Sequence, residues 1–435
     1  MAGLSKSGDW ANWAGDQRCR PARVLAPRSR EELAEAVGAA AAAGERIKVT
    51  GSGHSFTEAA TTEATMVRLD ALRGVLDVDR ASGLVKVGAG TVLRDLNEEL
   101  AALGLGLENM GDIDAQTVAG AISTGTHGTG AGFANISARV EAVEMVLADG
   151  SVRELAAGDP LLPAARIGIG ALGAISSVTI RCFPSFTLRR EDSAHRLADV
   201  LDRFDEYAER NDHFELFTFP YSDRALVLER NRTAEAPKPK SRVVALLNDV
   251  LLENWVLEAM AATGRRWPRT IPPLAKFAGL VATGTNNQDR SDRIFVNQRN
   301  VRFTEMEYAV PRADGPTAVR RVVEWVRSNR YPVFFPIEVR VAAGDDASLS
   351  AAHERETAYI AVHQYRGMEW RPYFEAVESI MDDYGGRPHW GKRHFQTATT
   401  LAPRYPKWTE FQAARDALDP ARVFANLYTD RVLGT

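Results

Sequence analysis

Two glycine-rich stretches decide the fold of this chain: VTGSGHSF at residues 49–56 and QTVAGAISTGTHGTG at residues 116–130. Glycine-rich loops expose backbone N–H groups without an obstructing Cβ, which suits an anionic phosphate or diphosphate. A single glycine loop is more often only a turn, because glycine's first use is a positive φ. Two loops of this length, both containing Ser or Thr donors, favour a bound dinucleotide.

A third glycine cluster, GIGALG at residues 168–173, matches the bare G-x-G-x-x-G pattern of Rossmann dinucleotide sites. The residues that follow it, AISSVTI at 174–180, are mostly β-branched or small and predict a strand. A pyrophosphate would therefore find no helix N-terminus after this cluster. We do not expect an NAD-type Rossmann domain.

The sequence around the first two loops alternates between helix and strand. Ser29 and Glu32 form a capping-box pattern before a predicted helix at 33–43. Thr91 is expected to cap a second helix at 92–103. Strands are predicted at 46–50, 65–69, 84–87, 140–147 and 175–181.

From about residue 183 the pattern changes to long strands and amphipathic helices. The strands are expected at 214–220, 304–310 and 333–341, and the helices at 317–328 and 370–383. The fold class is therefore α+β, with an α/β first part. Residues 231–300 gave no pattern from which a role could be inferred.

The composition excludes several classes of protein. The chain has 435 residues, 45% of them hydrophobic and 25% charged, and a net charge of −4, so we expect a globular protein that does not bind nucleic acid. Cys19 and Cys182 are too few for a disulfide scaffold or a cysteine-rich metal site, and no metal is expected. Residues 1–6 lack an apolar signal region, and no run is apolar enough to span a membrane. We therefore expect a cytoplasmic protein.

The two glycine stretches resemble the FAD-binding domain of the vanillyl-alcohol-oxidase superfamily. Within it, the chain resembles the sugar-1,4-lactone oxidases and the related alditol oxidases, on the evidence of EVR at 338–340, HWGK at 389–392 and the chain end LDPARVFAN at 418–426. This resemblance implies an FAD-binding domain of two α/β subdomains and a substrate domain with a large antiparallel sheet. The implied boundaries are 15–185 for the FAD-binding domain, 186–394 for the substrate domain, and 395–435 for a C-terminal segment returning to the FAD side.

The resemblance also implies that His54 is bonded covalently to the 8α-methyl carbon of the flavin. The other FAD-binding positions that it implies are Gly51, Ser52, Gly53, Ser55, Gly111, Thr117, Gly120, Ser123, Thr124 and Ile175. Gly111 matches a position over the reactive face of the flavin where a glycine favours reaction with oxygen. Two simpler explanations stay open: His54 could donate a hydrogen bond in a noncovalent site, and Gly111 could serve only the backbone geometry.

Glu338 and Arg340 are two residues apart in an apolar, strand-like run, so both side chains lie on one face. The pattern alone favours a structural ion pair. The resemblance instead implies an active-site pair, in which Arg340 holds the oxygen at the carbon being oxidised and Glu338 orients the hydroxyl or receives its proton. It likewise makes Lys392 the cation that stabilises negative charge at flavin N1 and C2, although HWGK alone could be a solvated turn. Asp112, His363 and His389 are candidate substrate-binding residues.

The implied function is FAD-dependent oxidation of an aldono-1,4-lactone, similar to L-gulono-1,4-lactone, at C2 by hydride transfer to flavin N5. The product would be of the ascorbate type, and oxygen or another acceptor would reoxidise the flavin. One alternative is an alditol or carbohydrate oxidase acting on a terminal hydroxyl. Another is a flavin-binding protein without turnover, against which the retention of Glu338, Arg340 and Lys392 argues.

Overall fold

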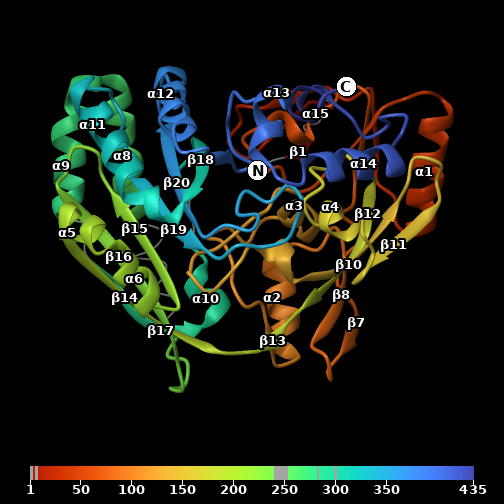
Figure 1. Cartoon of the computed structure of the whole chain (residues 1–435), viewed down its shortest axis with the longest axis horizontal. Helices are drawn as coiled ribbons and strands as arrows, with labels where there is room; N and C mark the ends of the chain where they lie inside the picture. The colour runs from red at the N-terminus through yellow and green to blue at the C-terminus, as the bar shows by residue number, and fades with distance from the viewer. Residues whose placement is uncertain (1–2, 5–7, 240–252, 282–283, 298–300) are drawn as a thin grey trace.

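The computed structural model describes residues 3–4, 8–239, 253–281, 284–297 and 301–435. Figure 1 shows two lobes side by side, with a large sheet and its helices on the left and a mixed lobe on the right. The C-terminal elements, in blue, lie on the right among the N-terminal ones. We call the left lobe the cap and the right lobe, which contains both glycine loops that are expected to bind FAD, the FAD lobe. Helices and strands together confirm the expected α+β fold.

The first sheet of the FAD lobe is parallel and ends at the first glycine loop. Its strand order is β4-β6-β5, with β4 at Arg23–Leu25, β5 at Ile47–Thr50 and β6 at Thr65–Arg68. Helix α1 (Arg30–Ala42) begins at Ser29, whose side chain accepts a hydrogen bond from the Glu32 N–H at 3.2 Å. The expected reciprocal bond is replaced, because the Glu32 carboxylate accepts from the Arg28 N–H at 2.7 Å. Only half of the predicted capping box therefore forms.

A second, antiparallel sheet completes this lobe, in the order β11-β10-β12-β8-β7. Its strands are β7 (Val75–Asp79), β8 (Leu84–Gly88), β10 (Val140–Val146), β11 (Val152–Ala156) and β12 (Ala174–Arg181). Helix α2 (Leu93–Ala102) begins at Val92 without a side-chain cap, so the prediction that Thr91 caps it is wrong. The Thr91 hydroxyl instead donates to the Gly88 carbonyl at 2.6 Å and accepts from the Gly74 N–H at 2.9 Å.

Short elements connect these sheets. They are β1 (Gly3–Leu4), β2 (Trp10–Ala11), β3 (Arg18–Cys19), β9 (Leu105–Gly106), α3 (Val118–Ser123), α4 (Leu162–Arg166) and β13 (Phe183–Pro184). Residues 174–181 form strand β12, which agrees with the prediction that no Rossmann helix follows the third glycine cluster.

The cap is built on an eight-stranded antiparallel sheet in the order β17-β14-β16-β15-β19-β20-β18-β21. The strands are β14 (Thr187–Arg196), β15 (His213–Thr218), β16 (Arg224–Thr233), β17 (Asn286–Arg290), β18 (Phe303–Pro311), β19 (Ile337–Ala342), β20 (Thr357–Tyr365) and β21 (Arg387–Pro388). The predicted strand at 333–341 begins only at Ile337, because Pro336 has no N–H to donate to a ladder. The cap helices are α5 (Leu197–Asp202), α6 (Phe204–Arg210), α8 (Glu253–Arg266), α9 (Ile271–Val281), α10 (Ser291–Phe295), α11 (Gly315–Ser328) and α12 (Arg371–Asp382).

The two faces of the cap sheet differ in chemistry. Apolar side chains of β15, β18, β19 and β20 pack against α5, α6, α11 and α12, for example Met306, Val339 and Ile360, all 0% exposed. Because side chains alternate along a strand, the residues between them face the other way. That opposite face carries the buried charges Glu215, Glu305, Glu307, Glu338 and Arg340. The alternation therefore directs the charged residues of β15, β18 and β19 away from the cap core.

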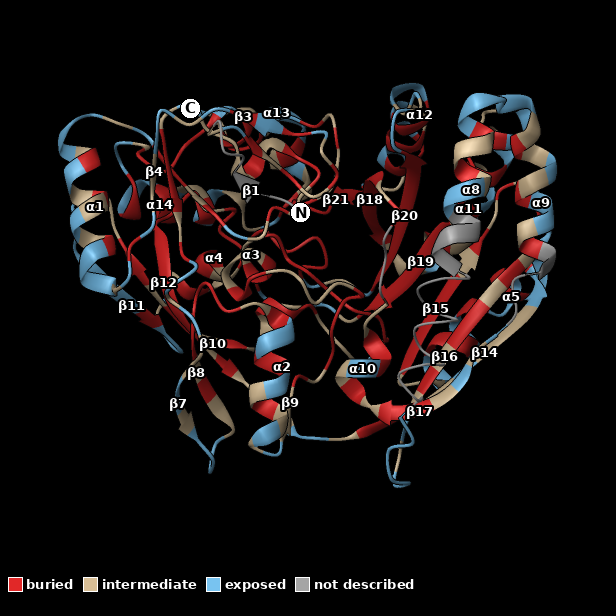
Figure 2. Cartoon of the chain, turned by 180° about the vertical axis from the view of Figure 1, so that it is seen from behind, coloured by how far each residue is buried: buried red, intermediate tan, exposed pale blue. Residues whose placement is uncertain are grey.

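The C-terminal segment packs into the core of the FAD lobe. It comprises α13 (Ala398–Leu401), α14 (Trp408–Leu418) and α15 (Leu427–Leu433). Phe411, Phe424 and Tyr428 are buried in the same cluster as Ile47 and Val67. Figure 2, which colours buried residues red, shows this core on the left and the cap sheet on the right.

The described part of the region 231–300 contributes helices α8, α9 and α10 and the edge strand β17 to the cap. Helices α8 and α9 pack against each other, α9 contacts β16, and β17 pairs with β14 at the edge of the sheet. Residues 240–252, which also belong to it, lie outside the described residues. Among the described residues, no helix is both long enough and apolar enough to cross a membrane.

Candidate active site

A cavity of about 930 Å³ lies between the glycine loops and the polar face of the cap sheet. Most of the predicted site residues line it: Gly51, Ser52, His54, Ser55, Gly111, Asp112, Thr117, Thr124, Glu338, Arg340, His389 and Lys392. A smaller adjoining cavity of about 100 Å³ shares Gly51 and Thr117 with it and adds Gly120, Ser123 and Ile175. The fold thus brings residues from both lobes to one place.

The two glycine loops meet at Gly51. A Cβ added to Gly51 would lie 2.3 Å from the Thr117 hydroxyl oxygen, so a larger residue would displace the Thr117 side chain. Gly53 makes the turn of the first loop with φ +68°, and its carbonyl accepts a hydrogen bond from the Trp13 N–H at 2.7 Å. Gly53 is thus a turn residue and does not line either cavity.

The end of the second loop is fixed to the cap sheet. The Gly130 N–H donates to the Val341 carbonyl at 2.8 Å, and the Val341 N–H donates to the Thr129 hydroxyl at 3.2 Å. Thr129 also donates to the Phe214 carbonyl. These bonds to β15 and β19 place the loop beside Glu338 and Arg340.

The segment HWGK is held against both the cap and the first loop. The His389 N–H donates to the Glu307 carbonyl at 3.0 Å, and the Gly391 carbonyl accepts from the Phe56 N–H at 2.7 Å. The Trp390 indole is buried and donates to the Leu349 carbonyl at 2.7 Å. The segment is therefore a buried part of the site and not a solvated turn.

Arg340 lies at the centre of a buried charge cluster. Its Nη2 is 2.5 Å from a carboxylate oxygen of Asp112, 2.5 Å from one of Glu338 and 3.0 Å from one of Glu215. Glu215 also contacts Arg230 at 2.9 Å. Burial opposes the charge of Arg340, but these carboxylates outweigh it and raise the pKa of Arg340. The guanidinium is thus permanently charged and rigidly held at the cavity wall.

Lys392 provides the second cation. Its Nζ lies 2.5 Å from Oε2 of Glu305 and 5.1 Å from the centre of the Phe56 ring. Burial would raise the pKa of Glu305, but Lys392 and, after it, His363 outweigh burial, and the pKa falls to about 2. Glu305 is therefore ionised and fixes the ammonium group at the cavity.

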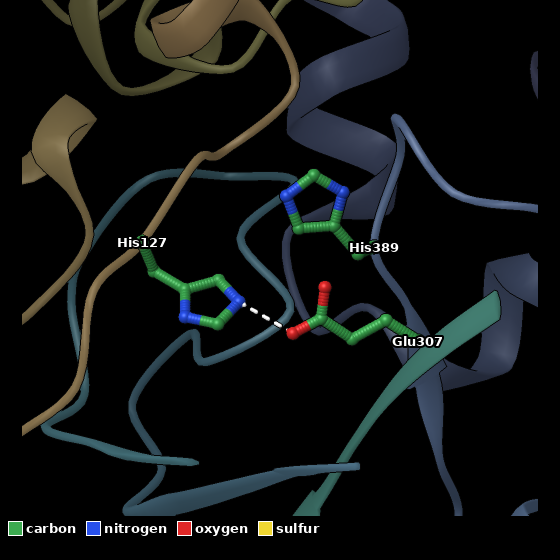
Figure 3. A group of neighbouring side chains, drawn as sticks. All are labelled: His127, Glu307 and His389. Atoms are coloured by element: carbon green, nitrogen blue, oxygen red, sulfur yellow. Dashed lines mark hydrogen bonds and ion pairs between the residues drawn. The ribbon is translucent and has the colours of Figure 1, made fainter. Parts of the chain in front are cut away.

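Three further buried residues form a group at the same wall (Figure 3). His127 Nδ1 lies 2.8 Å from the Gly128 carbonyl, and Nε2 lies 2.9 Å from Oε1 of Glu307. Because each ring nitrogen of His127 faces an oxygen, each of the two contacts contains a proton. The proton between Nε2 and Oε1 is shared by His127 and Glu307. His389 Nδ1 accepts from the Gly391 N–H at 3.0 Å, and burial lowers the pKa of His389 to about 3. His389 is therefore neutral and carries its proton on Nε2, as a donor.

His363 does not line the cavity. It is 2% exposed and lies behind two cavity residues, with Nε2 3.6 Å from Oε1 of Glu305 and 4.0 Å from Oε2 of Glu338. A direct contact with substrate, which the sequence suggested, would need a different side-chain position.

His54 lies on the first loop, with its ring stacked on Trp13 at 5.9 Å between centroids. Burial, and after it the charge of Lys392, lower the pKa of His54 to about 4. The imidazole is therefore neutral near pH 7, which is the nucleophilic form.

The donor groups in these cavities fit a dinucleotide such as FAD. The Thr50 hydroxyl, which lines both cavities, is buried without a hydrogen-bond partner among the described residues. A buried hydroxyl without a partner is costly unless a ligand satisfies it. Ser52, Ser55 and Thr124 add further hydroxyls beside glycine backbone. The loops can therefore hold the polar parts of a dinucleotide, and the cap-side cations face its reactive end.

Sequence reasoning missed Thr50, Glu215, Glu305, Glu307 and His127. One signal could have found two of them. Glu305 and Glu307 are charged residues, two positions apart, within the strand predicted at 304–310. This is the pattern that singled out Glu338 and Arg340. His127 stood inside the quoted second stretch and was not interpreted. Nothing local marks Thr50, because only the cavity shows that its hydroxyl lacks a partner.

Comparisons with known proteins identify the family of this chain. A family model described as D-arabinono-1,4-lactone oxidase matches residues 178–432, and one described as FAD binding domain matches residues 21–156. The chain is 51% identical to an L-gulono-1,4-lactone dehydrogenase of Mycobacterium tuberculosis, over 98% of this chain and 99% of that protein. It is 30% identical to the L-gulonolactone oxidase of Mus musculus, over 98% of each chain.

Among solved structures, a solvent-stable cholesterol oxidase has the same fold, with a TM-score of 0.85 and 21% identity over 98% of this chain and 97% of that one. The FAD lobe and the cap sheet of this chain thus have the fold of that protein. The chain is a member of the D-arabinono-1,4-lactone oxidase family, a family of FAD-dependent oxidoreductases.

Proposed function

We propose that this enzyme oxidises an aldono-1,4-lactone of the L-gulono-1,4-lactone type at C2, with FAD bound covalently through His54. The 2-keto lactone formed would tautomerise to an ascorbate-type enediol. The observation that carries the proposal is the pair Glu338–Arg340, buried on the polar face of β19 and open to the cavity. The name of the relative that is 51% identical supports the choice of lactone.

The chain's own residues position the substrate and handle its proton. Arg340 is charged and fixed by Asp112 and Glu215, so it can donate hydrogen bonds to the oxygen at C2. Glu338 can accept the proton of that hydroxyl, since its carboxylate lies at the cavity wall. FAD, when bound, supplies the hydride acceptor. Lys392, held by Glu305, offers positive charge for the electrons that arrive.

The covalent link is supported by the state of His54. Its ring is neutral near pH 7 and lines the same cavity as the FAD-binding loops. We predict that His54→Ala binds FAD, if at all, without a covalent bond. Denaturing gel electrophoresis with detection of flavin fluorescence checks this: wild type carries the fluorescence with its band and the variant does not. Fluorescence that stays with the denatured variant would place the bond on another residue.

Oxygen is the proposed acceptor. Gly111 lines the cavity, and a Cβ there would lie 2.9 Å from the His127 carbonyl oxygen, so the local backbone also requires glycine. The support for oxygen as the acceptor is thus that Gly111 places no side chain at this wall of the cavity.

Anaerobic mixing tests the proposed function. Purified protein is mixed with L-gulono-1,4-lactone and, separately, with xylitol, and the visible absorbance of the flavin is followed. We expect the lactone alone to bleach the flavin and air to restore the colour. Bleaching by xylitol alone would instead assign oxidation of a linear polyol, and the lactone assignment would be wrong.

A further inference from the structure

The hydrogen bonds of His363 leave one of its nitrogens without a partner inside the site. His363 Nδ1 lies 3.1 Å from the Pro336 carbonyl, an acceptor, so Nδ1 carries a proton, and the neutral form of the ring has its lone pair on Nε2. Nε2 then has a lone pair, and it has no hydrogen-bond partner among the described residues. A buried acceptor without a donor is costly, which calls for a functional reason.

The surroundings of this lone pair connect it to the substrate. His363 is on β20, Glu338 on β19 and Glu305 on β18, and cross-strand pairing sets Glu305 opposite His363. Nε2 faces Oε2 of Glu338 at 4.0 Å and Oε1 of Glu305 at 3.6 Å. Phe303, at 5.0 Å between ring centroids, and Phe335, at 6.2 Å, enclose the ring. The lone pair is thus reached from the cavity through the two carboxylates.

We infer that His363 is the proton acceptor behind Glu338, an inference that rests on the proposed function. The substrate O–H bond breaks as its proton passes to the Glu338 carboxylate. Once Glu338 Oε2 and His363 Nε2 approach from 4.0 Å to hydrogen-bond distance, a proton moves from Oε2 to Nε2. The C–H bond breaks with its electron pair leaving as hydride to the acceptor that FAD supplies, and the C=O bond forms. After product leaves, the proton returns through Glu338 to the cavity.

The charges around the ring suit this role. Glu338 is paired with Arg340 at 2.5 Å and Glu305 with Lys392 at 2.5 Å, so each carboxylate that faces His363 already has a cation. Because each carboxylate is paired with a cation, it attracts a proton on His363 Nε2 less strongly than an unpaired carboxylate would. When the ring gains its proton, both carboxylates face an N–H, and the unsatisfied acceptor becomes a satisfied donor. The proton therefore has a destination that Glu338 alone, bound to Arg340, does not offer.

Two variants separate this role from packing. His363→Asn can keep a donor near the Nδ1 position for the Pro336 carbonyl, but it has no nitrogen lone pair at Nε2. His363→Gln reaches the Nε2 position with an amide that cannot take up a proton, and it serves as the second variant should the first fail to fold. His213→Gln is the matched control, because His213 is also buried, bonds a carbonyl through Nδ1 at 2.7 Å and has an unpartnered Nε2 outside the cavity.

The measurement is the rate of anaerobic flavin reduction by L-gulono-1,4-lactone from pH 5 to 9 in each FAD-loaded protein. In wild type and His213→Gln we expect the rate to fall toward acid, because a ring that already carries a proton on Nε2 cannot accept another. In His363→Asn and His363→Gln we expect a rate at pH 8 more than tenfold lower and no such acid limb. The lactone concentration at half-maximal rate should change less than threefold, because His363 lies behind the cavity wall.

Two results would overturn the inference: a wild-type rate in both variants, or a rate lowered by the same factor at every pH with the acid limb retained. Failure of the lactone to bleach wild-type flavin would instead show the proposed function to be wrong. The same pH comparison with xylitol would then decide the role of His363 separately.

Discussion

At the scale of single residues, the site is organised by pairs of opposite charge that would be costly to bury alone. Lys392 and Glu305 form one pair, and Arg340 with Asp112, Glu215 and Glu338 forms the other. Removing one partner of a buried pair leaves an uncompensated charge, so the substitution of such a residue destabilises the site. The pairs therefore fix both cations at positions where negative charge develops during oxidation.

We predict that Lys392→Met keeps bound FAD but slows flavin reduction by the lactone more than tenfold, or about 1.4 kcal/mol of transition-state stabilisation. The reason is the loss of a fixed positive charge that acts more strongly on the transition state than on the ground state. Anaerobic stopped-flow absorbance measures the rate. Lys86→Met is the control, because Lys86 pairs with Glu144 and Glu154 outside the cavity. A wild-type rate for Lys392→Met would remove this lysine from the mechanism.

At the scale of elements, the strands position the chemistry. Period-2 alternation in β15, β18 and β19 sends apolar residues to the cap helices and charged residues to the opposite face, where those of β18 and β19 line the cavity. This much could be read from the sequence for Glu338 and Arg340. The partnership of Asp112 with Arg340 could not, because it depends on the pairing of a loop with a strand 228 residues later, a contact that no local pattern encodes.

The same limit explains the errors in local prediction. Thr91 has the residue type of a helix cap, but a turn at Gly74 and Gly88 competes for its hydroxyl. The helices and strands themselves were predictable because their apolar periodicity is long. His363 could be named from the resemblance, whereas its place behind Glu305 and Glu338 follows only from the register of β18 with β20.

Strand β5 contains a buried lysine whose titration should appear in stability. Lys48 is 2% exposed, and its Nζ donates to the Gly170 carbonyl at 3.0 Å and to the Phe424 carbonyl at 3.2 Å. Burial lowers the pKa of Lys48 from 10.5 to about 7. Between these values the unfolded chain binds more protons than the folded one, so the free energy of unfolding rises with pH.

We predict that Lys48→Met lacks this rise. The unfolding free energy of wild type minus that of Lys48→Met should grow by about 2 kcal/mol or more from pH 7 to 10, since each pKa unit corresponds to about 1.4 kcal/mol. Urea unfolding at four pH values measures it. Lys407→Met, at a half-exposed surface lysine, should run parallel to wild type. Parallel curves for Lys48→Met as well would show that Lys48 keeps its proton in the folded state.

At the scale of the whole molecule, the chain crosses between the lobes and returns. Residues of the C-terminal segment complete the core of the FAD lobe, and the Ile47 N–H donates to the Val423 carbonyl at 2.8 Å. Ile47 begins strand β5, and the first glycine loop directly follows that strand. The C-terminus thus supports the cofactor side of the site without lining the cavity.

We predict that Phe424→Ala lowers the free energy of unfolding by about 3–5 kcal/mol, because Phe424 is fully buried and its removal leaves a cavity. Leu427→Ala is the control in the same segment: Leu427 is 83% exposed, and its loss should change stability by about 0.5 kcal/mol or less. Chemical denaturation followed by flavin fluorescence measures both. Equal, small effects would mean that the segment is not part of this core.

The measurement that tests the central claim most directly is the rate of anaerobic flavin bleaching by L-gulono-1,4-lactone deuterated at C2, compared with the unlabelled lactone. The proposed chemistry breaks the C2–H bond as hydride leaves, so the deuterated lactone should bleach the flavin several times more slowly, with deuterium absent from the recovered 2-keto product. Equal rates for the two lactones, with the label retained in the product, would show that oxidation takes place elsewhere on the sugar and would contradict the account.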